Sequence, residues 1–308
     1  MKKILVSLAA LFAAATMLSA QSMAEATEIA KLANESLGSG DYETAVAGFR
    51  EALSMAEACG DEGLELVATC KNIIPKTLNA IAKGFLQDKK YDEAIAKFQE
   101  TIEVAREYGD DTTASKAEAL IPQIYMQKGG ALLNAKDYEG AAEAYSKLLE
   151  TDPSNGTAAL RLGMALEGAG KAEEAEEAYK TAAANGQEKA ANGQLGKMYL
   201  KRSVASLKAK KYANAASEAL VANEYAPNPQ ALQIAGQASQ LQGKNNDAIK
   251  YFEQYLEAAP TAKNAGQIAY TVGALYQQAK NNAKAKEYFQ KAVDAGYADA
   301  QKALSALK

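Results

Sequence analysis

The sequence predicts an all-α protein built from stacked pairs of antiparallel helices, and three observations lead to this prediction. A short pattern of core-type residues recurs seven times along the 308 residues. A residue that is nearly always small stands twelve positions before each recurrence. The chain is also rich in alanine, lacks tryptophan and histidine, and is only 7% aromatic. That composition suits closely packed helices better than a sheet.

The recurring pattern is an alanine, an aromatic or small residue four positions later, and a third core-type residue three positions further on. Spacings of four and three keep all three residues on one face of a helix, so each trio is expected to form a seam against a neighbouring helix. The seven copies are Ala45-Phe49-Ala52, Ala94-Phe98-Thr101, Ala141-Tyr145-Leu148, Ala175-Tyr179-Ala182, Ala215-Ala219-Ala222, Ala248-Phe252-Tyr255 and Ala285-Phe289-Ala292.

The preceding small residues mark a second helix in each unit, where two backbones could approach closely. They are Ala33, Ala82, Gly129, Gly163, Ser203, Gly236 and Gly273. Prolines at Pro153, Pro227 and Pro260 indicate where helices must end. Because a hairpin with two apolar faces cannot bury both alone, neighbouring hairpins must cover one another.

These positions resemble the tetratricopeptide repeat family, whose period is 34 residues and whose pattern runs from a small residue to alanine and an aromatic. The resemblance covers roughly Glu28 to Lys308. It implies a right-handed superhelix, or α-solenoid, of about seven stacked helix pairs. A weaker local likeness to Sel-like repeats is found at Lys180–Gly186 followed by Leu195–Tyr199, and it implies the same kind of fold.

The spacing departs from the family period, because the seam alanines lie 49, 47, 34, 40, 33 and 37 residues apart. The extra residues are expected to extend the first helices of repeats 2, 3 and 5, since Asp61–Ile74 and Asp111–Ile121 are themselves helix-like. Pro75 and Pro122 are then expected near the start of the regular first helix, as kinks or first-turn residues. Ala298–Lys308 carries an apolar side and is expected to form a terminal capping helix.

The N-terminus has the plan of a secretory signal. Lys2 and Lys3 precede an apolar run of about 15 residues, which is short of the roughly 20 that span a bilayer. Cleavage is expected after Ala20, or alternatively after Ala24, which leaves a repeat domain over residues 25–308. The protein is then exported and periplasmic, with no stable membrane span after signal removal; an uncleaved anchor is the alternative.

Charge and composition exclude several function classes. The absence of histidine removes histidine-based triads and histidine metal sites. The formal net charge of −4 argues against nucleic acid as a partner. No pattern indicates catalytic, cofactor-binding or metal-binding residues, and the acidic run Glu173–Glu177 is interpreted as a solvated face in which Glu176 pairs with Lys180. We therefore expect no enzymatic activity and no cofactor; a hydrolase that uses carboxylates alone is the remaining enzymatic alternative.

The two cysteines, Cys59 and Cys70, leave two alternatives open. Export would place them where disulfides persist. If the turn at Gly60–Gly63 is tight, however, Cys70 sits about 10 Å along its helix from the level of Cys59, too far for a bond.

In the resembled family, the first helices line a concave surface that holds extended peptides. Counting from the small residue of each first helix gives candidate binding positions three before, one after and four after it. In the sixth repeat, glutamines occupy these positions and form a stripe about 15 Å long that offers donors and acceptors without charge. The candidate residues are Gln230, Gln233, Gln237 and Gln240, with Gln267, Tyr270, Gln277 and Gln278 in the seventh repeat. Exposed helix-forming glutamines without a ligand are the alternative.

The same count predicts an apolar patch at Met126, Leu133, Leu160 and Met164, with packing against a neighbouring hairpin as the alternative. In the second repeat it selects Lys76, Asn79, Lys83 and Leu86. The lysines and the asparagine are similar to the carboxylate clamp of some family members, although the other clamp positions do not match; solvated charge is the alternative. The repeats, the signal-like N-terminus and the lack of catalytic patterns together lead us to expect a non-catalytic scaffold of the cell envelope that binds a protein or peptide in its concave groove. A glycan-binding or peptidoglycan-associated module is the alternative.

Overall fold

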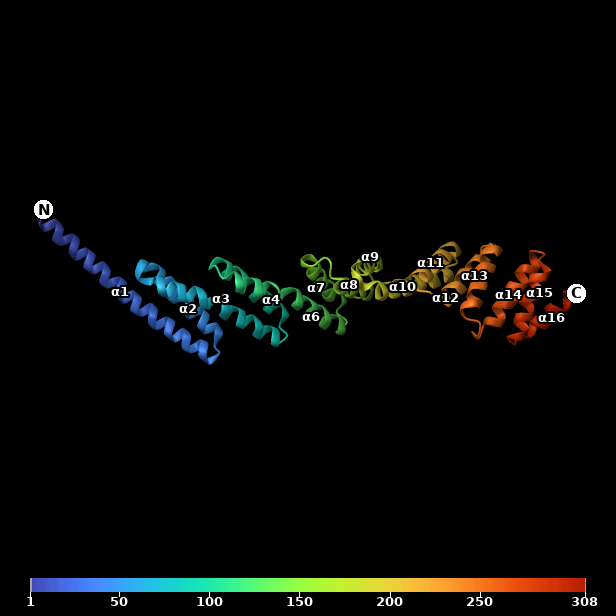
Figure 1. Cartoon of the computed structure of the whole chain (residues 1–308), viewed down its shortest axis with the longest axis horizontal. Helices are drawn as coiled ribbons and strands as arrows, with labels where there is room; N and C mark the ends of the chain where they lie inside the picture. Colours follow the sequence, from blue (N-terminus) through green and yellow to red (C-terminus); the bar gives the residue numbers. More distant parts are fainter. Residues whose placement is uncertain (1, 308) are drawn as a thin grey trace. The chain divides into compact units, whose positions relative to one another are not determined.

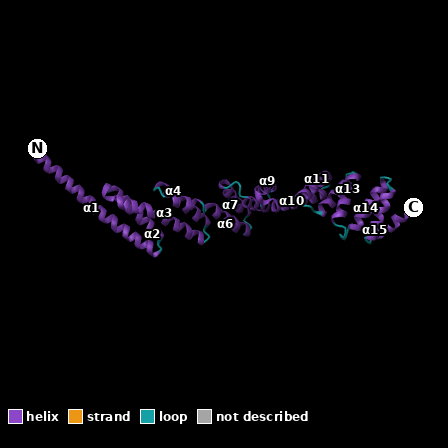
Figure 2. Ribbon diagram, in the orientation of Figure 1, coloured by secondary structure: helices purple, strands orange, loops and turns teal. Residues whose placement is uncertain are grey.

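The computed structural model describes the backbone of residues 2–307 and the side chains of residues 21–307. Every regular element in this part of the chain is a helix, and no β-strand occurs in it (Figure 2). The chain divides into two compact units, Met1–Pro153 and Ser154–Lys308, which are described separately. The side chains of the expected signal, residues 1–20, lie outside the described part, and cleavage after Ala20 or after Ala24 stays a prediction.

The first unit contains three helix pairs and one additional short helix (Figure 1). Its elements are α1 (Lys2–Ser39), α2 (Tyr42–Ala58), a 3-10 turn (Gly60–Gly63), α3 (Leu64–Gln87), α4 (Tyr91–Glu107), α5 (Asp111–Glu118), α6 (Ile121–Asn134) and α7 (Tyr138–Thr151). Helix α1 packs against α2, α3 against α4, and α6 against α7. Helix α3 also packs against α2, and α5 against α4, so successive pairs are stacked.

The second unit contains four helix pairs and a terminal helix. Its elements are α8 (Gly156–Gly168), α9 (Ala172–Ala182), a π-helical turn (Ala183–Gln187), α10 (Glu188–Lys208), α11 (Tyr212–Tyr225), α12 (Pro229–Leu241), α13 (Asn245–Ala258), α14 (Ala265–Gln278), α15 (Asn282–Asp294) and α16 (Ala298–Ala306). The pairs are α8 with α9, α10 with α11, α12 with α13, and α14 with α15. Helix α16 packs on α15 as the expected cap.

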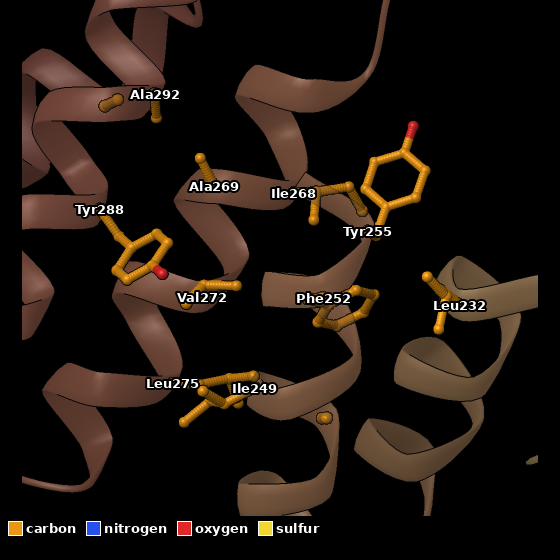
Figure 3. Packing of buried hydrophobic residues seen from close by; sticks show 12 residues of the cluster. Leu232, Ile249, Phe252, Tyr255, Ile268, Ala269, Val272, Leu275, Tyr288 and Ala292 are labelled. Carbon is orange, nitrogen blue, oxygen red and sulfur yellow. The ribbon is translucent and has the colours of Figure 1, made fainter. Parts of the chain in front are cut away.

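The seven seam alanines all lie between packed helices, which confirms the pattern that predicted the fold. Ala45, Ala94, Ala141, Ala175, Ala215, Ala248 and Ala285 are each 0% exposed. The residues four positions later are also buried. In the second unit, Figure 3 shows Val272 of α14 between Phe252 of α13 and Tyr288 of α15, within one buried cluster.

Glycine lets an aromatic ring lie directly on the backbone of the paired helix. A Cβ atom at Gly163 would lie 2.5 Å from the ring of Tyr179, far inside normal contact distance. The same fit joins Gly129 to Tyr145, Gly236 to Phe252 and Gly273 to Phe289. The fifth pair differs, because a buried Ser203 faces a helix whose equivalent position holds Ala219 instead of an aromatic.

Each of the seven pairs turns through a residue in the left-handed region. These residues are Gly40, Lys89, Lys136, Gly170, Lys210, Gly243 and Lys280. At the third turn, Lys136 N–H donates to Leu133 and Asp137 N–H to Leu132, which satisfies the last carbonyls of α6. The Asp137 side chain then caps α7 by accepting from Gly140 N–H.

Extension of the first helix is confirmed for repeats 2 and 5, where α3 has 24 residues and α10 has 21. The prediction was wrong for repeat 3, in which the extra residues form the separate helix α5. The break at Ala119–Leu120 precedes Pro122, which lies in the first turn of α6, where it loses no helical hydrogen bond. Pro75, in contrast, lies in the interior of α3. No helix in the described part of the chain is both long and apolar enough to cross a bilayer.

Candidate functional site

The glutamine stripe lies on the open face of α12. Gln230, Gln237 and Gln240 are exposed and Gln233 is half-buried, whereas the residues between them are mostly buried. None of the four carboxamides has a hydrogen-bond partner in the described part of the chain. The bond from Gln230 to the helix cap Asn228 is made by the backbone N–H and leaves the side chain unpartnered. The stripe therefore presents four carboxamides whose donors and acceptors face solvent.

An exposed leucine extends this surface and was missed by the sequence count. Leu241 is 51% exposed at the end of α12, directly after Gln240 and one turn after Gln237. Its signal was available, because Leu241 lies five positions after the small residue Gly236, just as the selected Gln278 lies five positions after Gly273. The stripe thus ends in an apolar contact.

The candidates on α14 behave differently from one another. Gln267, Gln277 and Gln278 are exposed. Gln278 accepts a hydrogen bond from Asn245 at the start of α13 at 3.4 Å, which ties it to the neighbouring pair. The ring of Tyr270 packs 5.4 Å from Phe289 and 5.2 Å from the ring of Tyr297. Tyr270 is therefore part of the packing of its own helix pair and contributes little free surface.

The predicted apolar patch is divided between the two units. Leu160 and Met164 lie one turn apart on α8 in the second unit, and Met164 is 40% exposed. Met126 is half-buried on α6 in the first unit. Each side chain is described within its own unit, and only the α8 pair shares a unit with the glutamine stripe.

The lysine and asparagine candidates share one face of α3 in the first unit. Lys76 and Lys83 are exposed, and Asn79 between them is half-buried. The Asn79 Oδ1 atom is buried without a hydrogen-bond partner. Lys76 donates to Asn72 at 2.5 Å, so its ammonium group is partly engaged within the helix.

Of the two alternatives for the cysteines, the structure has the one without a disulfide between Cys59 and Cys70. Cys70 is a free thiol, completely buried in the cluster that joins α2 and α3. Burial raises the pKa of this thiol, which keeps it protonated and unreactive.

Glu176 pairs with Lys180 at 2.9 Å, as the spacing predicted. The sequence did not show that Glu176 also accepts from Tyr199 at 2.8 Å and from Arg202 at 2.9 Å, both on α10. Burial alone would raise the pKa of Glu176, but these three donors hold it below its usual range. The side chain is only 13% exposed, so this acid fixes α9 against α10 and is not a solvated charge.

Comparisons with known proteins assign the repeats. A family model described as tetratricopeptide repeat matches residues 79–155 and 126–192, and a second model with the same description matches residues 229–261 and 266–295. Together these ranges cover more than half of the chain. The chain belongs to the tetratricopeptide repeat family. As a tetratricopeptide repeat protein it is a scaffold for protein–protein interaction.

Solved structures with similarity to this tetratricopeptide repeat chain include "Crystal structure of MamA protein", with 23% identity, 59% of this chain and 96% of that chain covered, and a TM-score of 0.37. A second is "Crystal structure of YrrB: a TPR protein with an unusual peptide-binding site", with 23% identity, coverage of 56% and 84%, and a TM-score of 0.33. A third concerns pilF of Pseudomonas aeruginosa, with 21% identity, coverage of 56% and 76%, and a TM-score of 0.30. No curated protein sequence matches the chain. The family assignment rests on the family models.

Proposed function

We propose that the second unit binds an extended peptide segment of a protein partner along the open face of α12. The observation that carries this proposal is the row of four carboxamides without partners in the described chain, at Gln230, Gln233, Gln237 and Gln240. A carboxamide can donate to a backbone carbonyl and accept from a backbone N–H at the same time. A stripe about 15 Å long would accommodate about four or five residues of an extended chain.

Apolar side chains of the second unit would supply the remaining contacts. Leu241 lies at its end, and Met164 and Leu160 present an apolar strip on α8 in the same unit. Exposed methionine and leucine adapt to different side chains at a binding surface. The preferred peptide is therefore uncharged where it crosses α12, with at least one apolar side chain.

The proposed site of action is the periplasm of the cell envelope, which rests on the signal-like N-terminus. We also propose that the protein acts without catalysis. Among the described residues, every carboxyl group with a shifted pKa is shifted downward, at Glu100, Asp110, Glu176 and Glu287. A carboxylic acid that works as a general acid near neutral pH needs a raised pKa instead.

The test compares Gln237→Ala/Gln240→Ala with Gln254→Ala/Gln301→Ala, a control that removes two exposed glutamines from α13 and α16. Both variants and the wild type are used as bait in native envelope extracts, followed by mass spectrometry. We expect the first variant to lose its partner with unchanged thermal stability, while the control keeps it. A partner retained by the first variant would contradict the proposed surface.

Two further measurements separate the remaining alternatives. Sedimentation with purified cell-wall sacculi that depends on Gln237 and Gln240 would replace the peptide by a glycan ligand. N-terminal sequencing of the protein recovered from the periplasmic fraction should start at Gln21 or Glu25; a chain found only in the cytoplasm with its N-terminus intact would contradict the envelope location.

A further inference from the structure

A groove in the second unit lies between the two second helices α13 and α15, above the start of α14. Its volume is about 450 Å³, which is within the range of small ligand sites. Leu256, Ala265 and Ala269 form an apolar floor, and the ring of Tyr288 forms a wall. Glu253, Glu257 and Asp294 add three carboxylates, and we call this site the acidic groove. It shares no residue with the glutamine stripe.

None of these three carboxylates has an ammonium or guanidinium group within ion-pair distance among the described residues. Lys291 also lines the groove, but its ammonium group pairs with Glu287 at 2.9 Å, and Lys284 pairs with the same carboxylate at 2.8 Å. The groove lining thus carries three carboxylates against one ammonium group. Asp294 accepts only from the neutral amide of Gln290, at 2.8 Å. The groove therefore has an excess of negative charge beside an apolar floor.

Tyr276, which stacks on Tyr288, holds the Glu253 carboxylate in position. Tyr276 donates to Glu253 at 2.8 Å and stacks on Tyr288 with the ring centroids 5.7 Å apart. Burial and the Glu253 carboxylate raise the pKa of Tyr276 to about 12, so its hydroxyl remains a donor at neutral pH. Glu253 is thus a charged acceptor with a fixed orientation, and the face of Tyr288 already holds one alkylammonium group, with Lys291 Nζ 4.2 Å from the ring centroid.

The first unit contains the equivalent groove with its charges neutralised. It lies between α4 and α7 above the start of α6, has a volume of about 760 Å³ and is lined by Ile102 and Tyr125, among others. Helix α5 also lines it through Ser115 and Glu118. Lys147 occupies the same register position as Lys291 but pairs with the acid three residues later, Glu150, at 3.0 Å. The other acid that lines this groove, Glu118, pairs with Arg106 at 2.8 Å.

The comparison shows what is missing from the acidic groove. Lys291 pairs with the acid four residues before it, Glu287, so Asp294 at the position of Glu150 lacks a cation. We propose that a basic side chain of a protein partner, arginine or lysine, supplies this charge. Its aliphatic stem would lie on the apolar floor, and its cationic head would meet Glu257 and Asp294 at the opening and Glu253 inside. This second docking site is independent of the peptide proposed for the glutamine stripe.

The experiment uses three pentapeptides that differ only at the central residue: arginine, lysine, or citrulline, which is neutral and has nearly the shape of arginine. Each is titrated into the isotopically labelled full chain, and backbone amide shifts are followed by nuclear magnetic resonance. We expect the two basic peptides to shift amides around Leu256, Ala269 and Ala295, while the citrulline peptide does not. The stronger of the two basic peptides identifies the preferred cationic group.

Two double variants complete the design. Glu257→Gln/Asp294→Asn changes two exposed acids and should weaken binding of the basic peptides by about ten-fold or more, because a charged hydrogen-bonding partner is lost at each position. Glu118→Gln/Glu150→Gln makes the matched change in the first-unit groove and should leave binding unchanged. Equal binding of the citrulline peptide, or equal binding to the first variant, would overturn the proposal. Gln237→Ala/Gln240→Ala should not affect these peptides, so failure of the two proposals can be distinguished.

Discussion

Replacing Gly163 with alanine should destabilise the second unit, although alanine is the better helix former. The new Cβ would lie 2.5 Å from Cδ1 and 2.6 Å from Cε1 of Tyr179. The ring is fully buried, and its hydroxyl donates to Glu167 at 3.0 Å, so it has no free space into which to move. Overpacking costs about 1–3 kcal/mol, and the gain in helix propensity offsets about 1 kcal/mol. The expected net loss of stability is therefore up to about 2 kcal/mol.

The control is Gly193→Ala, in the interior of α10 in the same unit, where an added Cβ meets nothing within 4 Å. This change should stabilise the unit by about 0.5–1 kcal/mol. Urea unfolding followed by circular dichroism measures both variants. In the Tyr179→Ala background, Gly163→Ala should become stabilising, because that background lacks the ring with which the new Cβ would clash. Similar stabilisation by both glycine substitutions in the wild-type background would refute the packing argument.

Three further substitutions test single contacts. Tyr145→Phe should stabilise the first unit by about 1 kcal/mol in urea unfolding, because the Tyr145 hydroxyl is buried without a partner; a loss of stability would contradict this. Lys136→Gly should stabilise the first unit by about 0.5–1 kcal/mol, because Lys136 has a φ of 63°, in the left-handed region that favours glycine. No gain in stability would show that the turn is unstrained. Glu176 has a lowered pKa in the folded state, so its contribution to stability is present above its unfolded pKa and is lost as the pH falls through the folded value. Glu176→Gln should therefore flatten the acid side of a plot of melting temperature against pH, and an unchanged profile would show that the ion pairs contribute nothing.

The sequence predicted the helix pairs because their core residues have constant spacings within each pair, although the pairs themselves recur at unequal intervals. A glycine or small residue and a seam alanine twelve positions later are local features, and the burial of Ala175 or Ala248 follows from their position on the helix. The glutamine stripe was found for the same reason, since its exposure depends only on the face of α12 on which it lies. Features that repeat with the helix can be read from one sequence.

Features that depend on contacts between different helices could not be read in this way. Glu176 looked like one of several surface acids because Tyr199 and Arg202 lie more than 20 residues away on the next helix. The acidic groove combines side chains of α13, α14 and α15. Its charge depends on the ion pair of Lys291, which is formed with Glu287 and not with Asp294. Helix α5 was predicted as an extension of α6 because its composition is helical, whereas the chain turns just before Pro122.

In the fifth helix pair, α10 with α11, no aromatic ring packs against the small residue Ser203 of α10. The buried residues of α11 are only Ala215, Ala219 and Ala222, so this helix removes less apolar surface from water than α13 or α15, which bury phenylalanine and tyrosine. Less buried apolar area means a lower free energy of local opening. In hydrogen exchange, the amides of α11 should therefore be the first in the interior of the second unit to lose protection, and a protease should find its earliest cleavage sites there.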